Sequence, residues 1–428
     1  MRIAVVNWSR RALGGAETYL AGILPDLVAA GHEVAFWSEQ DQPWNRERIP
    51  LPDGVPEWCV AEVGLERALE GLRAWAPDLA FVHITTGPET EAAVMEVAPA
   101  VLLAHGYYGT CISGAKTHKS PVPTPCSRPL GWQCLLHYYP HRCGGLSPLT
   151  MLRDFRRNSD RKSLLPAYRA VVANSRHIRD ELVANGCDPA RVHAVPLPVG
   201  DVGAAGGDPA GDPSSIPDPP EWRLLFLGRM DRLKGGRTLV DALPAIRART
   251  GRPLRVTFAG DGPDRAAWEE RAARVARAGD GVAVEFVGWT RGAELEALWT
   301  RTDLLVVPSL WPEPFGLVGP EAGLRGVPAA AFAVGGIPDW LQDGVNGHLA
   351  PADPPTAAGL ADAVARCLED PAAHALLRSG AREVARRFGR KAHLEALLRI
   401  FEDVVRSGRQ TAGRPLPRLR QTRTFQVR

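Results

Sequence analysis

The chain has 428 residues, of which 45% are hydrophobic, and its formal net charge at pH 7 is +3. This length favours two domains of roughly 200 residues, each with enough apolar side chains for a core. A charge so close to zero gives no argument for nucleic-acid binding, and no apolar run approaches the roughly 18 residues that span a bilayer.

The N-terminus predicts a strand at 3–6 and lacks the long apolar core of a signal peptide. We therefore expect a cytoplasmic protein. Composition leaves open a peripheral contact with the inner face of a membrane. The oligomeric state does not follow from the sequence.

Apolar strands and amphipathic helices alternate through the first part of the chain. Further strands are predicted at 34–37, 79–83 and 100–104, and a long amphipathic helix follows Gly14 and Gly15. This order predicts a parallel α/β sheet. The two glycines either form a simple tight turn or let a phosphate or sugar approach bare backbone N–H groups. They do not form G-x-G-x-x-G, so the dehydrogenase fingerprint is absent.

His105 directly follows the predicted strand at 100–104 and precedes Gly106. In open α/β sheets, ligands bind outside the carboxyl ends of the strands. This position favours a functional role for His105 over a packed histidine that only bonds to a carbonyl.

An insertion at about 109–160 is rich in Cys, His and Pro. It contains Cys111, Cys126, Cys134 and Cys143. Such clustering suits a structural Zn or Fe–S site, although no C-x-x-C pair is present. Separate buried thiols and disulfides are the alternatives, and a cytosolic setting disfavours disulfides. Because the insertion follows His105, we expect it to form a wall or lid next to that residue, on the side that would hold an acceptor if the protein transfers a group.

The first domain is predicted to cover 1–199 and to end with a strand at 170–174, a helix capped by Asn174-Ser175 and a strand at 192–198. Residues 200–221 are almost all Gly, Asp, Pro, Ala and Ser, which predicts a linker. The second domain follows at 222–390 and an amphipathic helix at 391–408. The tail at 409–428 has six Arg and no acidic residue, which predicts disorder.

Arg229 and Lys234 lie five positions apart in a loop after a predicted strand at 223–227. The planar fork of Arg and the point charge of Lys together suit the two phosphates of a nucleoside diphosphate. The alternative is a solvated basic loop.

Two carboxylates flank a turn after the predicted strand at 304–308. Glu313 lies on the loop and Glu321 in the first turn of the next helix. Carboxylates only accept hydrogen bonds, so the pair suits sugar hydroxyls. The alternative is that Glu313 is a solvated loop residue and Glu321 interacts with the helix dipole.

These motifs resemble those of retaining glycosyltransferases of family 4, which have the GT-B fold. The resemblance rests on the Glu-x7-Glu motif of Glu313 and Glu321 with Phe315-Gly316 between them, on the Gly-Arg…Lys-Gly loop at 228–235, and on Gly-Gly-Ala-Glu at 14–17. It covers nearly the whole chain and is strongest at 224–350. Asp339 stands where the family usually has Glu, and Gly319, Pro320 and Gly323 stand where it more often has bulkier residues.

The resemblance implies an α/β fold with two Rossmann-like domains facing across a cleft, and a C-terminal helix that crosses back to the first domain. It implies catalytic or positioning roles for His105, which contacts the transferred sugar, for Glu313, which accepts donor-sugar hydroxyls, and for Arg229 and Lys234, which hold the diphosphate. Glu321 would accept ribose hydroxyls, and Gly14 and Gly15 would leave space for the donor. Backbone N–H groups would reach the sugar and phosphate from Phe315, Gly316, Leu317 and Val318.

The implied activity is transfer from a nucleoside-diphosphate sugar to a glycan, lipid-linked or small-molecule acceptor, with no cofactor or metal required for the transfer. The residues leave two alternatives open: a non-catalytic nucleotide-sugar-binding protein of the same fold, and a nucleotide-sugar epimerase. The sugar, the base and the acceptor do not follow from the sequence.

Overall fold

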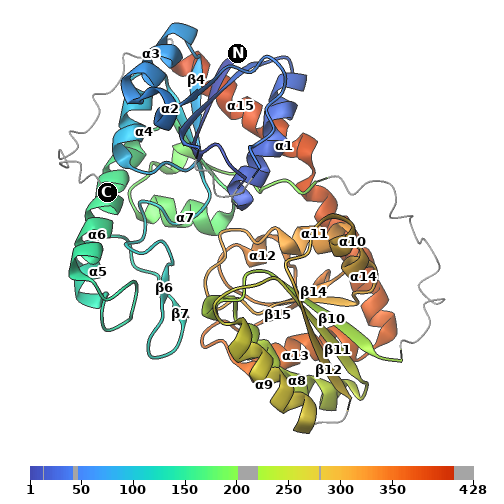
Figure 1. The fold of residues 1–428 in the computed structure, drawn as a ribbon. Helices are drawn as coiled ribbons and strands as arrows, with labels where there is room; N and C mark the ends of the chain where they lie inside the picture. The colour runs from blue at the N-terminus through green and yellow to red at the C-terminus, as the bar shows by residue number, and fades with distance from the viewer. Residues whose placement is uncertain (13, 42–46, 201–219, 279–280, 409–428) are drawn as a thin grey trace. The chain divides into compact units, whose positions relative to one another are not determined.

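The computed structural model describes residues 1–12, 14–41, 47–200, 220–278 and 281–408 (Figure 1). Nearly all of the predicted linker at 200–221 lies outside the described residues, as does the whole predicted tail at 409–428.

Contacts divide the chain into two compact units. Unit 1 comprises Met1–Gly114, Arg128–Pro196 and, among the described residues, 391–408, and unit 2 comprises Ala115–Ser127 and Leu197–Arg390. This division differs from the predicted domains at two places. Residues 115–127, from the middle of the predicted insertion, group with unit 2, and the first domain ends at Pro196 instead of 199.

Unit 1 is built on a parallel sheet that has seven strands among the described residues, in the order β3-β2-β1-β4-β5-β8-β9. The strands are β1 (Arg2–Ser9), β2 (Glu33–Gln40), β3 (Glu57–Cys59), β4 (Leu79–Val82), β5 (Ala100–Ala104), β8 (Ala170–Ala173) and β9 (Val192–Ala194). The helices are α1 (Gly15–Ala29), α2 (Val60–Val63), α3 (Leu65–Trp75), α4 (Pro88–Met95), α5 (Gln133–His137), α6 (Pro148–Leu164), α7 (Arg176–Ala184) and α15 (Arg390–Gly408). Every residue of β4 and β8 is buried, as expected for a parallel sheet with both faces covered.

Helix α15 belongs to unit 1 from Lys391 onward, which confirms the predicted return of the last helix to the first domain. Its apolar side buries Leu397, Phe401 and Val404. Phe401 packs edge-on against Phe81 of β4, with ring centroids 4.9 Å apart. Figure 1 shows the red C-terminal helix beside the blue N-terminal elements of this unit. The packing explains why the chain returns: without it, the apolar side of α15 would face water.

His393 ties the start of α15 to two other segments of unit 1. Its Nδ1 lies 2.7 Å from the carbonyl oxygen of Pro196, and its Nε2 lies 2.8 Å from the hydroxyl of Tyr19 on α1. The carbonyl only accepts, so we place the ring proton on Nδ1, and Nε2 accepts from Tyr19. Burial lowers the pKa of His393 to about 4, against weaker opposite effects of its Pro196 hydrogen bond and of Asp26.

Unit 2 contains a second parallel sheet, with six described strands in the order β12-β11-β10-β13-β14-β15. The strands are β10 (Trp222–Leu227), β11 (Leu254–Ala259), β12 (Val282–Gly288), β13 (Leu304–Val307), β14 (Ala329–Phe332) and β15 (Gly347–Ala350). The helices are α8 (Gly236–Thr250), α9 (Arg265–Ala278), α10 (Gly292–Thr300), α11 (Val318–Leu324), α12 (Ile337–Trp340), α13 (Ala357–Leu368) and α14 (Pro371–Ala385). The inserted residues that group with this unit form an antiparallel hairpin of β6 (Thr117–His118) and β7 (Thr124–Pro125).

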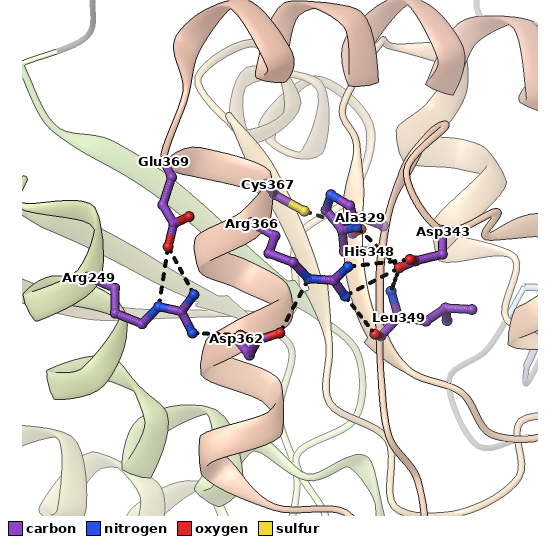
Figure 2. Close-up of polar contacts among 9 residues, drawn as sticks. All are labelled: Arg249, Ala329, Asp343, His348, Leu349, Asp362, Arg366, Cys367 and Glu369. Carbon is purple, nitrogen blue, oxygen red and sulfur yellow. Dashed lines mark hydrogen bonds and ion pairs between the residues drawn. The ribbon is translucent and has the colours of Figure 1, made fainter.

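A surface network of charged side chains braces one side of unit 2 (Figure 2). Arg249 of α8 bridges Asp362 of α13 and Glu369, which lies about two helical turns further along the chain, with N–O distances of 2.7 and 3.0 Å. Arg366 of α13 reaches Asp343, which also accepts a hydrogen bond from the backbone N–H of Leu349 in β15. Each exposed pair is worth little by itself, but together they fix the edge strand β15 against α13.

No helix in the described part of the chain is long and apolar enough to cross a membrane.

We predict that acid destabilises unit 1 partly through His393. The unfolded side chain binds a proton near its ordinary pKa of 6.5 and the folded one only near 4, so stability is lost as the pH falls from 6.5 toward 4. Linkage gives roughly 2 kcal/mol for this group at pH 5. Urea denaturation at pH 7 and pH 5 should show that His393→Gln loses less stability on acidification than the unsubstituted chain. An equal loss in both proteins would show that His393 does not titrate on unfolding.

Candidate active site

The centre of the candidate site in unit 2 is an ion pair between Lys234 and Glu313. Strands β10 and β13 are neighbours in the sheet, so the loops at their carboxyl ends meet. Lys234 Nζ lies 2.7 Å from Glu313 Oε1, and Ser309 Oγ donates to the same oxygen. Glu313 is only 6% exposed, which contradicts the alternative that it is a solvated loop residue.

Asp231 organises the basic loop around this pair. Its carboxylate accepts hydrogen bonds from the backbone N–H groups of Leu233 and Lys234 and so caps the short turn at 232–234. It also binds the side chain of Arg229, with Nε 3.0 Å away. Arg229 is largely exposed, so most of its guanidinium is open to a ligand. The sequence predicts the two cations, Arg229 and Lys234, but not the role of the Asp231 carboxylate that positions them.

Gly235 holds the two strand-end loops in contact. Its φ of +72° lies in the left-handed region, and a Cβ at this position would lie 1.8 Å from the carbonyl oxygen of Pro308. Leu310 N–H also donates to Leu233 O at 2.7 Å. Only a glycine lets the backbone after Lys234 approach the backbone before Glu313 this closely.

The segment from Phe315 to Val318 leads from Glu313 into α11. The ring of Phe315 is buried, and Trp340 donates its indole N–H to the carbonyl of Phe315 at 2.7 Å. None of the described residues accepts a hydrogen bond from the backbone N–H groups of Phe315, Gly316, Leu317 or Val318. These four donors therefore have no partner within the described part of the chain.

The small residues at the start of α11 have a packing explanation. A Cβ on Gly319 would lie 2.3 Å from the ring of Trp340, and one on Gly323 would lie 2.8 Å from the carbonyl oxygen of Ala381 in α14. Trp340 and Ala381 of α14 occupy the space next to these two glycines. Helix α11 therefore starts at Val318 and still carries Glu321 in its first turn.

Glu321 has a different environment from Glu313. Burial raises the pKa of its carboxyl, the nearby Arg325 opposes this rise, and Glu296 adds to it. No side chain among the described residues donates a hydrogen bond to the Glu321 carboxylate. A partly desolvated acceptor without a donor is suited to ligand hydroxyls.

In unit 1, His105 lies at the end of β5 beside His83, which follows the neighbouring strand β4. His83 Nδ1 and His105 Nε2 are 3.0 Å apart, and the ring of Tyr19 packs against both imidazoles. Burial lowers the pKa of His105 to about 4, so this ring is neutral at pH 7. No role for His83 is predicted from the sequence, although its position at the end of the adjacent strand could have identified it.

Gly14 and Gly15 lie at the start of α1, which follows the carboxyl end of the central strand β1 in the same sheet. A Cβ on Gly15 would have no heavy atom within 4 Å, and one on Gly14 would meet only a carboxylate oxygen of Glu17 at 3.5 Å. Packing within the described residues therefore does not require glycine here. Open space at these positions is what their predicted role next to a donor needs.

The inserted helix α6 contributes to the edge of the sheet near His105. Arg161 forms a buried ion pair with Glu91 of α4, with Nε and Oε1 2.8 Å apart. His83, His105, Glu91, Tyr108 and Arg161 are among the residues that line a small cavity of about 30 Å³. The residues at 109–160 do not line this cavity; its wall on this side comes from Tyr108 and Arg161, just outside the predicted insertion, and the charged pair is not predicted from the sequence.

The arrangement of the cysteines does not support the predicted metal site. Cys126 groups with unit 2, whereas Cys111, Cys134 and Cys143 belong to unit 1. Cys134 and Cys143 pack against a small apolar cluster of Ile112, Leu130 and Tyr138. Across the described ranges no three Cys, His, Asp or Glu side chains are grouped as a metal ion requires, and all seven cysteines, which lie within those ranges, are outside disulfides. For Cys134 and Cys143 the structure favours separate thiols, half-buried instead of buried as predicted, because both pack against the apolar cluster.

The predicted site residues therefore fall into two groups. Arg229, Lys234, Glu313, Phe315–Val318 and Glu321 belong to unit 2, and Gly14, Gly15 and His105 belong to unit 1. Within unit 2 the structure brings Lys234 and Glu313 into direct contact. The supporting residues that the sequence analysis overlooks are Asp231, Ser309 and Trp340.

Family models match the chain in two successive segments. The model described as Glycosyltransferase Family 4 matches residues 13–200, and the model described as Glycosyl transferases group 1 matches residues 221–370. The two segments together span most of the chain and correspond to its two sheets.

Curated relatives include D-inositol 3-phosphate glycosyltransferase 1 of Catenulispora acidiphila, which is 32% identical over 59% of this chain and 61% of its own length. The glycogen synthase of Mycobacterium tuberculosis is 40% identical over 35% of this chain and 34% of its own length. The chain thus matches between one third and about three fifths of the length of these relatives.

Solved structures resemble almost the entire chain. Sucrose-phosphate synthase from Thermosynechococcus elongatus superposes with a TM-score of 0.64 at 20% identity and covers 95% of this chain and 99% of its own. Anabaena HepE in complex with UDP-glucose gives a TM-score of 0.60 at 18% identity, over 96% and 100% of the two chains. At these identities the likeness concerns the fold, and it confirms the predicted fold class.

We predict that Gly235→Ala destabilises unit 2 far more than Gly251→Ala. Both glycines flank α8 with similar φ angles, +72° and +68°, but a Cβ on Gly251 has no heavy atom within 4 Å. Gly251→Ala should lose only the left-handed preference, roughly 1 kcal/mol, whereas Gly235→Ala must also displace Pro308. Urea denaturation measures both losses. Equal losses would contradict the loop contact at Gly235.

Proposed function

This chain belongs to glycosyltransferase family 4, and we propose that it transfers a sugar from a nucleoside-diphosphate sugar to an acceptor with retention of the anomeric configuration. Glycosyl transfer is the activity of the family. We propose in addition the class of donor, the stereochemical outcome and the roles of individual residues.

The Lys234–Glu313 pair carries the proposal. Glu313 uses Oε1 for both Lys234 and Ser309, and no described residue donates to Oε2. That oxygen is an acceptor for hydroxyls of the donor sugar. Lys234 has three ammonium hydrogens, so its bond to Glu313 leaves others for a phosphate oxygen. A sugar hydroxyl and a phosphate would thus be bound by two adjacent side chains.

Arg229 supplies the second positive charge. Asp231 holds its Nε, and the remaining N–H groups of the exposed guanidinium suit a bidentate bond to phosphate. In the transition state the departing diphosphate gains negative charge, so two preorganised cations lower the barrier without a metal in this role. The open N–H groups of residues 315–318 add neutral donors to the same loop region.

Glu321 is proposed to accept the ribose hydroxyls. Its carboxylate is partly desolvated, and the described residues leave it without a side-chain donor. The complex of the structural neighbour HepE with UDP-glucose supports a nucleotide-sugar donor for this fold. The base and the sugar specific to this chain are to be determined by experiment.

His105 is proposed to contact the transferred sugar as a neutral imidazole. Its low pKa keeps the ring uncharged at pH 7, so it can exchange hydrogen bonds with a hydroxyl without repelling a developing oxocarbenium ion. None of the proposed site residues is positioned as a covalent nucleophile. We therefore assign retention to displacement on one face of the sugar, assisted by the leaving phosphate.

The function is tested with a panel of UDP-, GDP- and ADP-sugars. Thermal stabilisation identifies the donor, because a ligand that binds the folded state raises the apparent stability. Release of the nucleoside diphosphate is then followed with and without candidate acceptors. A glycosylated acceptor supports the proposal, a new sugar isomer without acceptor would indicate an epimerase, and binding without turnover would indicate a non-catalytic protein.

Arg229→Ala and Lys234→Ala should each lower the transfer rate by about 10²–10⁴-fold, since each removes a charge that matters most in the transition state. The matched control is Arg232→Ala, which removes an exposed arginine from the same loop. Its rate should stay within about twofold of the unsubstituted enzyme. Initial rates with the identified donor provide the measurement, and near-normal rates in both site variants would refute the assignment.

A further inference from the structure

The inserted segment of unit 1 exposes an unusual set of large apolar side chains. Six of them between residues 132 and 152 are at least 40% accessible to solvent. They are Trp132 (65%), Leu136 (62%), Tyr139 (40%), Leu146 (82%), Leu149 (80%) and Leu152 (41%). We call this set the apolar face. A concentration of this kind on one surface segment usually marks a site that is covered in use.

The apolar face is not needed for the internal packing of the segment. Helices α5 and α6 pack through a separate cluster, in which Ile112, Leu130 and Tyr138 are buried and five other side chains rest against them. Those five are Cys134, Leu135, Cys143, Met151 and Phe155. Figure 1 shows α5 and α6 side by side in green. The inward side chains complete a small core, so the outward ones are surplus to the fold.

The charge around the apolar face is strongly positive. Residues 128–157 contain five arginines, at 128, 142, 153, 156 and 157, and a single acidic residue, Asp154. The segment also holds His137 and His141, whereas the whole chain carries a net charge of only +3. Arg142, Arg153 and Arg156 are exposed among the apolar residues.

We propose that the apolar face is a docking surface for a lipid bilayer with anionic headgroups. Exposed leucines with arginines between them suit insertion into the boundary between headgroups and acyl chains. Trp132 and Tyr139 are the residue types that favour this boundary, and the arginines match the negative surface potential of anionic lipids. A second protein copy with the same surface would bring like charges together, which disfavours that occupant.

One consequence of membrane docking rests on the proposed function: a glycosyltransferase held at a bilayer through its inserted segment is expected to act on an acceptor attached to lipid. The docking itself does not depend on catalysis and is tested separately from it.

The test uses the full chain and sedimentation with vesicles of phosphatidylcholine, with or without phosphatidylglycerol. The chain should bind the anionic vesicles, and binding should weaken with added salt. Leu146→Ser combined with Leu149→Ser should reduce binding by at least about tenfold, because both leucines are exposed and contribute apolar area to the membrane. Arg153→Ala combined with Arg156→Ala should reduce it on anionic vesicles only. Leu376→Ser is the matched control, since Leu376 is 67% exposed on α14, outside the segment.

Thermal stabilisation by the identified donor should be unchanged in all these variants, which separates a failure of docking from a failure of the proposed function. Absence of binding to both kinds of vesicle would overturn the docking proposal. So would a dimer in sedimentation equilibrium that becomes monomeric in the double leucine variant, because the apolar face would then belong to a second copy.

Discussion

The ion pair between Lys234 and Glu313 sets the geometry of the candidate site, because a buried carboxylate is tolerated only with a cation and hydrogen-bond donors next to it. Glu313 receives both, from Lys234 and Ser309. Several features of unit 2 serve to keep these groups together. Adjacent strands β10 and β13 aim their loops at the same edge, Gly235 allows the loop backbones to touch, and Asp231 shapes the turn that presents Lys234. A ligand phosphate would accept from an ammonium hydrogen that Glu313 does not use, on a cation that is already held in place, so little reorganisation is needed on binding.

The two units have similar sheets, but the charges at the carboxyl ends of their strands differ. At the carboxyl edge of the sheet in unit 2, cations and carboxylates pair with each other and keep further hydrogen-bonding atoms for a ligand. This suits a charged diphosphate and polar sugars. Near His105 in unit 1, the imidazoles are neutral through burial, and the charges of Arg161 and Glu91 are already matched. Such an environment suits the uncharged hydroxyls of a sugar or acceptor. The contrast follows from which residues sit at the strand ends and not from the fold itself.

Helix α6 begins in the insertion and continues beyond it to Arg161, which lies at the edge of the sheet beside His105, while the exposed side of the insertion forms the apolar face. One short module thus links the rim of the candidate site to an unpartnered surface. The family models match the two sheets in turn, and the structural neighbours share the fold.

The sequence by itself determined the two α/β units, nearly all of their longer strands, the return of the last helix, and the charged residues at the edge of the second sheet. It could do so because buried parallel strands are continuous apolar runs and their carboxyl ends meet at one edge, which places Arg229, Lys234 and Glu313 at that edge. Only the tertiary structure decided which groups pair. Lys234 binds Glu313 while Arg229 binds Asp231, His105 faces His83, Trp340 fills the space beside Gly319, and the clustered cysteines separate between the two units. Apart from the Arg229–Asp231 pair, these contacts join residues that lie far apart in the chain, and residue spacing along the sequence does not show which of them meet.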